Sequence, residues 1–321
     1  MEPLPTGANF KRAKVLWELG LHIAGDPAIK YGGNRDMSIV VGSGGGDKFI
    51  PSLKLATGSA IMALAVAKGD VDIAFVNPSA MLTQAYRGTG VFDAPLPLRI
   101  IGNYPSFDRF VIAFRDKLGF KSLTDVKKAK YPLQFSLRED PTHSTLALVN
   151  QLFAHHGMSI AEIESWGGKV HPCSGPGDIR RLNAMKDGSL DAVFDEGISA
   201  WLGVAVANGM SPVNLDEAAL AHLSALGWRH GPLKSARFDN FPAGYTCIDF
   251  SGWPLYARAS LPDKVAYDVA QAFGARHDEM PWEAQTHQGI AQIGAETAAT
   301  PMDVPLHPGA ERWYREQGFL K

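Results

Sequence analysis

The sequence has few cysteines, no run of like charge and no long apolar segment. Its two cysteines, Cys173 and Cys247, are far apart and in no metal-binding spacing. We interpret both as structural thiols; a disulfide between them requires export to an oxidising compartment. The formal net charge is -2, with acidic and basic residues mixed, so neither nucleic acid nor an anionic membrane surface is indicated as a partner.

No apolar run approaches the length that spans a membrane. Residues 1–25 do not have the pattern of a signal peptide, because Lys14 and Glu18 interrupt the apolar positions and no cleavage-type tail follows. Two interpretations stay open. If Met1 is the native start, we expect a cytoplasmic protein; if a signal peptide has been removed, we expect a periplasmic one.

The clearest pattern in the chain lies in residues 56–81. Ser59 is suited to cap a helix that continues through Leu64 to Lys68, and Gly69 is a typical helix stop. Residues 71–76 then form a short apolar strand.

A second helix start follows this strand directly. Asn77 ends the strand, Pro78 suits a first helical turn, and Ser79 continues it. Two helix N-termini therefore open beside strand ends, each with unpaired N–H groups and a positive dipole end. Such positions in an α/β sheet bind small anions, including carboxylates.

The construction occurs twice along the chain. The segment KGDVDIAFVNP is matched by DGSLDAVFDEG at residues 187–197, and each combines a glycine turn, an apolar strand and a polar strand end. A further strand, at 133–137, ends in a polar loop and a long helix. We therefore predict an α/β protein with two lobes of similar construction.

These segments, in this order, resemble the TAXI-type solute-binding proteins of tripartite (TRAP) transporters. The matching segments are ATGSA with KGDVDIAFVN, SLTDVKKAKYPLQFSLREDPTHSTL, MKDGSLDAVFDEG, FPAGYT, LPDKVAYDVAQAF and LHPGAERWYREQG. The resemblance implies a type II periplasmic-binding-protein fold, with a central cleft and two crossing strands as hinge. Lobe 1 would comprise residues 1–114 and 245–321, and lobe 2 residues 115–244.

The resemblance also implies which residues face the ligand, a small carboxylate or amino acid, and names membrane transporter subunits as partners. In lobe 1 these residues are Thr57, Gly58, Ser59, Asn77 and Ser79. In lobe 2 they are His143, Ser144, Thr145 and the strand end at Asp195 and Glu196.

The chemistry of four polar residues leads to further expectations. Arg138 either clamps a carboxylate in bidentate fashion or forms a salt bridge with Glu139 or Asp140. His143, at a helix start, is expected to be neutral and either contacts the ligand or caps the helix. Adjacent residues on a strand alternate, so we expect Asp195 and Glu196 to point apart.

The sequence offers no nucleophile arrangement, no metal-ligand spacing and no cofactor motif, so we predict no metal and no cofactor. The first hypothesis is solute binding by domain closure, without chemistry on the ligand. The alternative is a cytosolic decarboxylase or lyase on the same fold, with His143, Glu139 or Glu196 as acid–base groups. A cytosolic ligand sensor is the third hypothesis.

Overall fold

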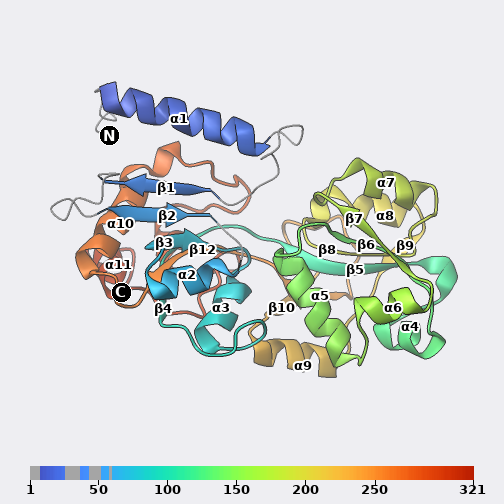
Figure 1. The fold of residues 1–321 in the computed structure, drawn as a ribbon. Helices are drawn as coiled ribbons and strands as arrows, with labels where there is room; N and C mark the ends of the chain where they lie inside the picture. The colour runs from blue at the N-terminus through green and yellow to red at the C-terminus, as the bar shows by residue number, and fades with distance from the viewer. Residues whose placement is uncertain (1–7, 26–36, 43–51, 58–59) are drawn as a thin grey trace.

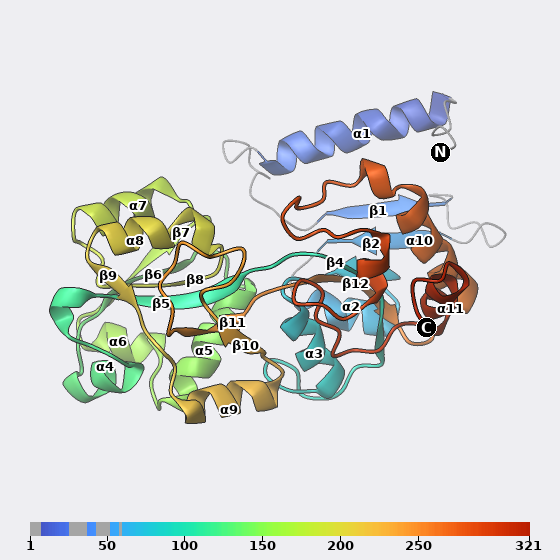
Figure 2. The same cartoon turned by 180° about the vertical axis from the view of Figure 1, so that it is seen from behind.

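The protein folds into two lobes, each built on its own β-sheet (Figure 1). The computed structural model describes residues 8–25, 37–42, 52–57 and 60–321. Within these residues, lobe 1 contains a five-stranded sheet and lobe 2 a seven-stranded sheet. Helices pack around both sheets, as the front and back views show (Figures 1 and 2). The predicted two-lobed α/β fold class is confirmed.

The sheet of lobe 1 has the strand order β1–β2–β3–β12–β4, with β2 and β3 parallel and the other neighbours antiparallel. Its strands are β1 (Ser38–Val41), β2 (Leu53–Ala56), β3 (Ile73–Phe75), β12 (Trp253–Arg258) and β4 (Leu98–Tyr104). The helical segments are α1 (Ala8–Gly25), α2 (Met62–Lys68), α3 (Ser79–Arg87), α10 (Asp263–Ala275), η3 (His277–Glu279), η4 (Ile290–Gly294) and α11 (Pro308–Glu316).

The sheet of lobe 2 has the order β10–β11–β5–β8–β6–β7, and β9 also pairs with β5. Its strands are β5 (Arg109–Arg115), β6 (Gln134–Arg138), β7 (Lys169–Cys173), β8 (Ala192–Asp195), β9 (Met210–Pro212), β10 (His230–Pro232) and β11 (Thr246–Asp249). The helical segments are η1 (Asp116–Leu118), α4 (Leu123–Ala129), α5 (Ser144–His155), α6 (Ile160–Ser165), α7 (Ile179–Lys186), η2 (Ile198–Ala200), α8 (Leu202–Ala207) and α9 (Glu217–Leu226).

The chain crosses between the lobes twice, at 105–108 between β4 and β5 and at 250–252 between β11 and β12. The predicted boundaries at 114 and 245 had left β5 and β11 in lobe 1. Both strands pair within the sheet of lobe 2, where Phe110 lies opposite Ile248. The boundaries therefore move to the two crossing segments.

Apolar packing continues from one lobe into the other. One cluster of buried residues includes Met81 of α3, Phe110 of β5 and Leu148 of α5. Two further clusters fill the individual lobes, around Phe273 in lobe 1 and Trp201 in lobe 2. Burial of apolar area contributes roughly 25 cal/mol per Å². The continuous cluster therefore stabilises the contact between the lobes.

Candidate functional site

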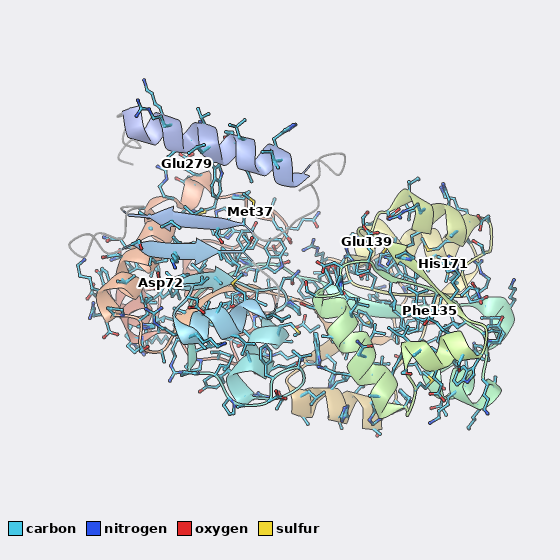
Figure 3. All side chains as sticks on the ribbon, in the orientation of Figure 1. Met37, Asp72, Phe135, Glu139, His171 and Glu279 are labelled. Carbon is cyan, nitrogen blue, oxygen red and sulfur yellow. The ribbon has the colours of Figure 1, made fainter. Side chains whose placement is uncertain are left out.

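The strand ends of the two lobes face each other across the crossing segments. Strand β3 of lobe 1 leads into Asn77, and β6 and β8 of lobe 2 end at Arg138 and Asp195. Met37 and Glu139 lie on these facing sides (Figure 3). The hydroxyl of Ser144, the first residue of α5, donates a hydrogen bond of 2.5 Å to the backbone carbonyl oxygen of Asn77. The predicted helix starts are thus in contact.

The start of α3 is attached to strand β4 and to the second crossing segment. The N–H of Ser79 donates to the carbonyl oxygen of Ser251 at 3.2 Å, and its hydroxyl accepts from Asn103 Nδ2 at 3.1 Å. Gly252 has a φ of 76°, and a Cβ there would lie 2.3 Å from Ser79 Oγ. This glycine lets the second crossing segment approach the helix start.

His143 caps α5. Its Nδ1 accepts a hydrogen bond of 3.2 Å from the backbone N–H of Thr145, so this ring nitrogen carries no proton. Its Nε2 lies 3.9 Å from Glu196 Oε1. The capping role expected of a histidine at a helix start is present, and the ring also faces the acid at the end of β8.

Arg138 binds two carboxylates of its own lobe. Its Nε donates to Asp195 Oδ1 at 2.9 Å, and its Nη2 donates to Glu196. These partners differ from Glu139 and Asp140, the salt-bridge partners considered from the sequence. The expectation that Asp195 and Glu196 point apart is wrong, because β8 ends at Asp195 and the strand alternation ends with it.

Arg181 of α7 completes this ionic cluster. Its Nη1 donates to Asp195, and its Nε donates to Ser136 Oγ at 2.9 Å. The side chains of Arg181 and Asp195 are both fully buried. Two guanidinium groups therefore share the Asp195 carboxylate, and little positive charge of Arg138 remains uncompensated.

A pair of acids joins the first crossing segment to lobe 2. Asp108 accepts from the N–H of Gly197 at 2.8 Å and shares a hydrogen bond with Glu196. Burial raises the pKa of Glu196 well above its usual range, and the negative charge of Asp195 adds to this effect. Burial also raises the pKa of Asp108. Burial thus favours the protonated form of both acids.

The predicted residues around Thr57 are only partly covered by the structure. Thr57 is exposed, its N–H donates to the carbonyl oxygen of Met37 at 2.8 Å, and its Oγ1 accepts from the N–H of Met37 at 2.7 Å. Gly58 and Ser59 lie outside the described residues. Helix α2 begins at Met62, later than the sequence predicted.

Sequence analysis missed a second set of contacts between the lobes. Gln151 Nε2 of α5 donates to Gln84 Oε1 of α3 at 3.0 Å. Within lobe 2, the indole N–H of Trp228 donates to Gln151 Oε1 at 2.6 Å and holds this glutamine in place. Arg229 Nε donates to Asp303 Oδ2 at 2.8 Å. Trp228 also stacks on Phe250 of the second crossing segment, at 5.8 Å between ring centroids. No local sequence signal connects residues this far apart in the chain.

A separate hollow of about 370 Å³ lies at the other end of β5, between Phe120, Val213 and Tyr245. Arg115 in its lining donates to the backbone carbonyl oxygens of Leu190, Asn208 and Met185, each at 2.8 Å. This guanidinium is occupied by carbonyl groups near the ends of α7 and α8 and before β8, so it is not available to an anion.

Neither a metal site nor a membrane span is found in the described part of the chain. Its histidines, cysteines and acids form no group of three that could hold a metal ion, and its helices include none long and apolar enough to cross a bilayer. Cys173 and Cys247 are buried free thiols.

Residues 253–318 match the NMT1-like family. This segment contains β12, α10 and α11 and is less than half of the chain. The match therefore does not assign the whole chain to that family.

Several solved structures of transporter components are similar to this chain. One is described as a periplasmic transporter, with 11% identity and a TM-score of 0.38 over 82% of this chain and 81% of that chain. Another is the periplasmic sulfonate-binding protein of a putative ABC transporter from Methylobacillus flagellatus KT, with 9% identity and a TM-score of 0.35 over 81% and 79%. A third is a binding-protein component of an ABC phosphonate transporter from Pseudomonas aeruginosa, with 13% identity and a TM-score of 0.35 over 67% and 59%.

At these identities and TM-scores no ligand carries over from those proteins to this chain. The two-lobed architecture rests on the two sheets and the two crossing segments described above. None of the comparisons distinguishes the TAXI type from other solute-binding proteins. The resemblance of this chain to that type therefore stays a prediction.

Proposed function

We propose that this protein binds a small solute with a carboxylate group between its two lobes, by closure of the lobes, and delivers it to a membrane transporter. The observation that supports this proposal is the contact of Ser144 with Asn77, which joins the start of α5 to the strand end before α3. Each helix start has N–H groups without intrahelical partners and a positive dipole end. An anion that contacts both starts favours the closed form.

The proposed ligand contacts combine these helix starts with the polar residues beside them. The set is Asn77, Ser79, His143, Ser144, Thr145 and Glu196, together with Thr57, Gly58 and Ser59 by resemblance. Arg138 has a different role in this proposal, because Asp195 and Glu196 already engage its guanidinium. It holds the Glu196 carboxyl in place beside the ligand.

A TRAP-type transporter of the TAXI class is the proposed partner, and the periplasm is the proposed location. Support for both comes from the order of the matching sequence segments. Both parts depend on solute binding, which is therefore the first property to test.

The test is a thermal-shift screen of the purified protein against short carboxylates and amino acids, with sulfonates and phosphonates as comparators. Titration calorimetry then measures each hit, and NMR of the released ligand shows whether it is unchanged. Binding of carboxylates with unchanged release is the expected result. Binding of sulfonates or phosphonates alone would overturn the carboxylate assignment.

A second candidate is acid–base catalysis on the bound solute. It is favoured by the raised pKa of Glu196 and by the 3.9 Å separation between its Oε1 and His143 Nε2. A carboxyl group with a raised pKa keeps its proton to higher pH and can act as a general acid. Conversion of a hit on prolonged incubation, abolished in Glu196→Gln, would support this candidate over simple binding.

A further inference from the structure

The hollow in lobe 2 takes no part in the proposed function. Strand β5 runs from the first crossing segment to the far side of lobe 2, and the hollow lies at that far end (Figure 1). Its volume of about 370 Å³ falls within the range of about 300–1,000 Å³ typical of small-molecule sites. The pairing of β5 with β9 and with β11 brings the lining segments together.

One part of the lining is aromatic. Phe120 and Tyr245 contribute partly buried rings, and Val213 adds an aliphatic side chain. Phe120 is held by edge contacts with Phe114, at 6.2 Å between ring centroids, and with Tyr131, at 5.2 Å. A flat ring packs on such side chains in an offset or edge-to-face arrangement. The shape and chemistry of this wall therefore favour an aromatic ligand over an open-chain one.

The charges around the hollow favour an anion. Arg115 gives its hydrogen bonds to three neutral backbone carbonyl groups, so no bonded carboxylate balances its positive charge. The exposed Lys121 adds a second positive charge to the lining, and Asp116 adds one negative charge. The lining thus carries a net positive charge, which attracts an anion even though the Arg115 guanidinium does not contact it.

Three polar groups of the lining are available to a ligand. They are the ammonium group of Lys121 and the hydroxyls of Ser211 and Tyr245, none of which has a hydrogen-bond partner in the part of the chain that the structure describes. The amide of Asn214, by contrast, is already bonded at both its ends. An ammonium group and two hydroxyls can all donate to the oxygens of a carboxylate.

We propose that this hollow is a second binding site, separate from the proposed site between the lobes, for a small aromatic carboxylate. The ring of the ligand packs on Phe120, Val213 and Tyr245, and its carboxylate binds the ammonium group of Lys121. The two sites share no residue. The inference therefore goes beyond the proposed function and stands or falls independently of it.

Calorimetry on the full chain with benzoate, benzamide and cyclohexanecarboxylate tests the ligand class. An exposed ion pair contributes up to about fivefold in affinity, so benzoate should bind about fivefold tighter than the uncharged benzamide. Ring packing should favour benzoate over cyclohexanecarboxylate by about twofold to tenfold. Equal affinities of benzoate and either comparator, or no saturable binding of benzoate, would overturn the proposal.

A charge reversal tests the role of the lysine. Lys121→Glu replaces the attracting charge by a repelling one at an exposed position, and we expect benzoate affinity to fall about tenfold. Lys128→Glu is the matched control, because Lys128 is an exposed lysine of α4 outside the lining and the net charge changes equally. A loss of the same size in both variants would show that only net charge matters and would contradict the contact with Lys121.

A second variant tests the location. Val213→Trp fills the hollow with a larger side chain and should remove one benzoate site per chain, while thermal unfolding shows whether the variant is folded. If it is not, Lys121→Glu decides the question alone. Benzoate binding that is unchanged in both variants and falls in Ser144→Ala would place the ligand between the lobes and overturn the assignment.

Discussion

The hydroxyl of Ser144 and the backbone carbonyl oxygen of Asn77 form a hydrogen bond of 2.5 Å between residues 67 positions apart. The bond ties the first turn of α5 to the end of the β3 segment. Because the acceptor is a backbone atom, the contact needs no particular side chain in lobe 1. It does need the two lobes to be together, so in the proposed closure it belongs to the closed form.

Ser144→Ala removes this bond between the lobes. A hydrogen bond contributes about 0.5–1.5 kcal/mol, so we expect ligand affinity to fall by about threefold to tenfold. The free energy of unfolding in urea should change much less than the free energy of ligand binding. Calorimetry and small-angle scattering, which reports the opening of the lobes, are the measurements.

Ser159→Ala is the matched control for this prediction. Ser159 caps α6 by accepting from the N–H of Glu162 at 3.1 Å, away from the contact between the lobes. It should lose about 1 kcal/mol of stability and no affinity. Wild-type affinity in Ser144→Ala would show that its contact takes no part in closure.

Arg138→Met tests the ionic cluster. The Arg138 side chain is 3% exposed and engages Asp195 and Glu196. Removing one partner of a buried ion pair typically costs about 3–5 kcal/mol, because the remaining charge is left without compensation. We expect a loss of this size in urea denaturation. A stable variant that has lost only its affinity would instead place Arg138 in direct contact with the ligand.

Glu196→Gln tests the acid pair through the pH dependence of stability. Burial raises the pKa of Glu196 in the folded state above the unfolded value of about 4.5, so the folded state binds more protons over that interval. This group therefore makes the free energy of unfolding fall as pH rises above about 4.5. The variant lacks this term, so its stability relative to wild type should increase as pH rises above about 4.5. A stability difference between Glu196→Gln and wild type that is the same at all pH values would contradict the raised pKa of Glu196.

Arg229→Gln tests the contacts on the other side of the crossing segments. Arg229 of lobe 2 binds Asp303 and Glu296 of lobe 1 and is 37% exposed. An exposed ion pair contributes up to about 1 kcal/mol, so we expect affinity to fall no more than about fivefold. The difference should vanish at about 1 M salt, where charges are screened within about 3 Å. Lys264→Gln, which removes a pair with Asp268 within α10, should leave affinity unchanged.

The sequence predicted the elements better than their assignment to sheets. The apolar run at 133–137 corresponds to β6, and the apolar run at 71–76 contains β3. The predicted lobe boundaries, however, placed β5 and β11 with the wrong sheet. A buried strand is apolar on both faces whichever sheet it joins. Its membership depends on pairings such as Phe110 with Ile248, which lie far apart in the chain.

Asn77 was expected at a strand end from its own pattern, and Ser144 was implied by the resemblance. The structure brings these two residues into contact, and their binding of a ligand stays a prediction. Asp108 and Arg181 were missed, because their roles come from partners brought close by folding. The error on Glu196 has a local cause. It lies just beyond β8, before Gly197 with a left-handed φ of 63°, where the alternation rule no longer applies.

Trp228 gives the molecule an optical reporter of its own. The indole is 2% exposed, donates to Gln151 and stacks on Phe250 between the lobes. Separation of the lobes would bring water to this ring and shift its fluorescence to longer wavelengths. Solute binding should reverse the shift, and Trp228→Phe should abolish it. Closure can thus be followed by emission, without an attached dye.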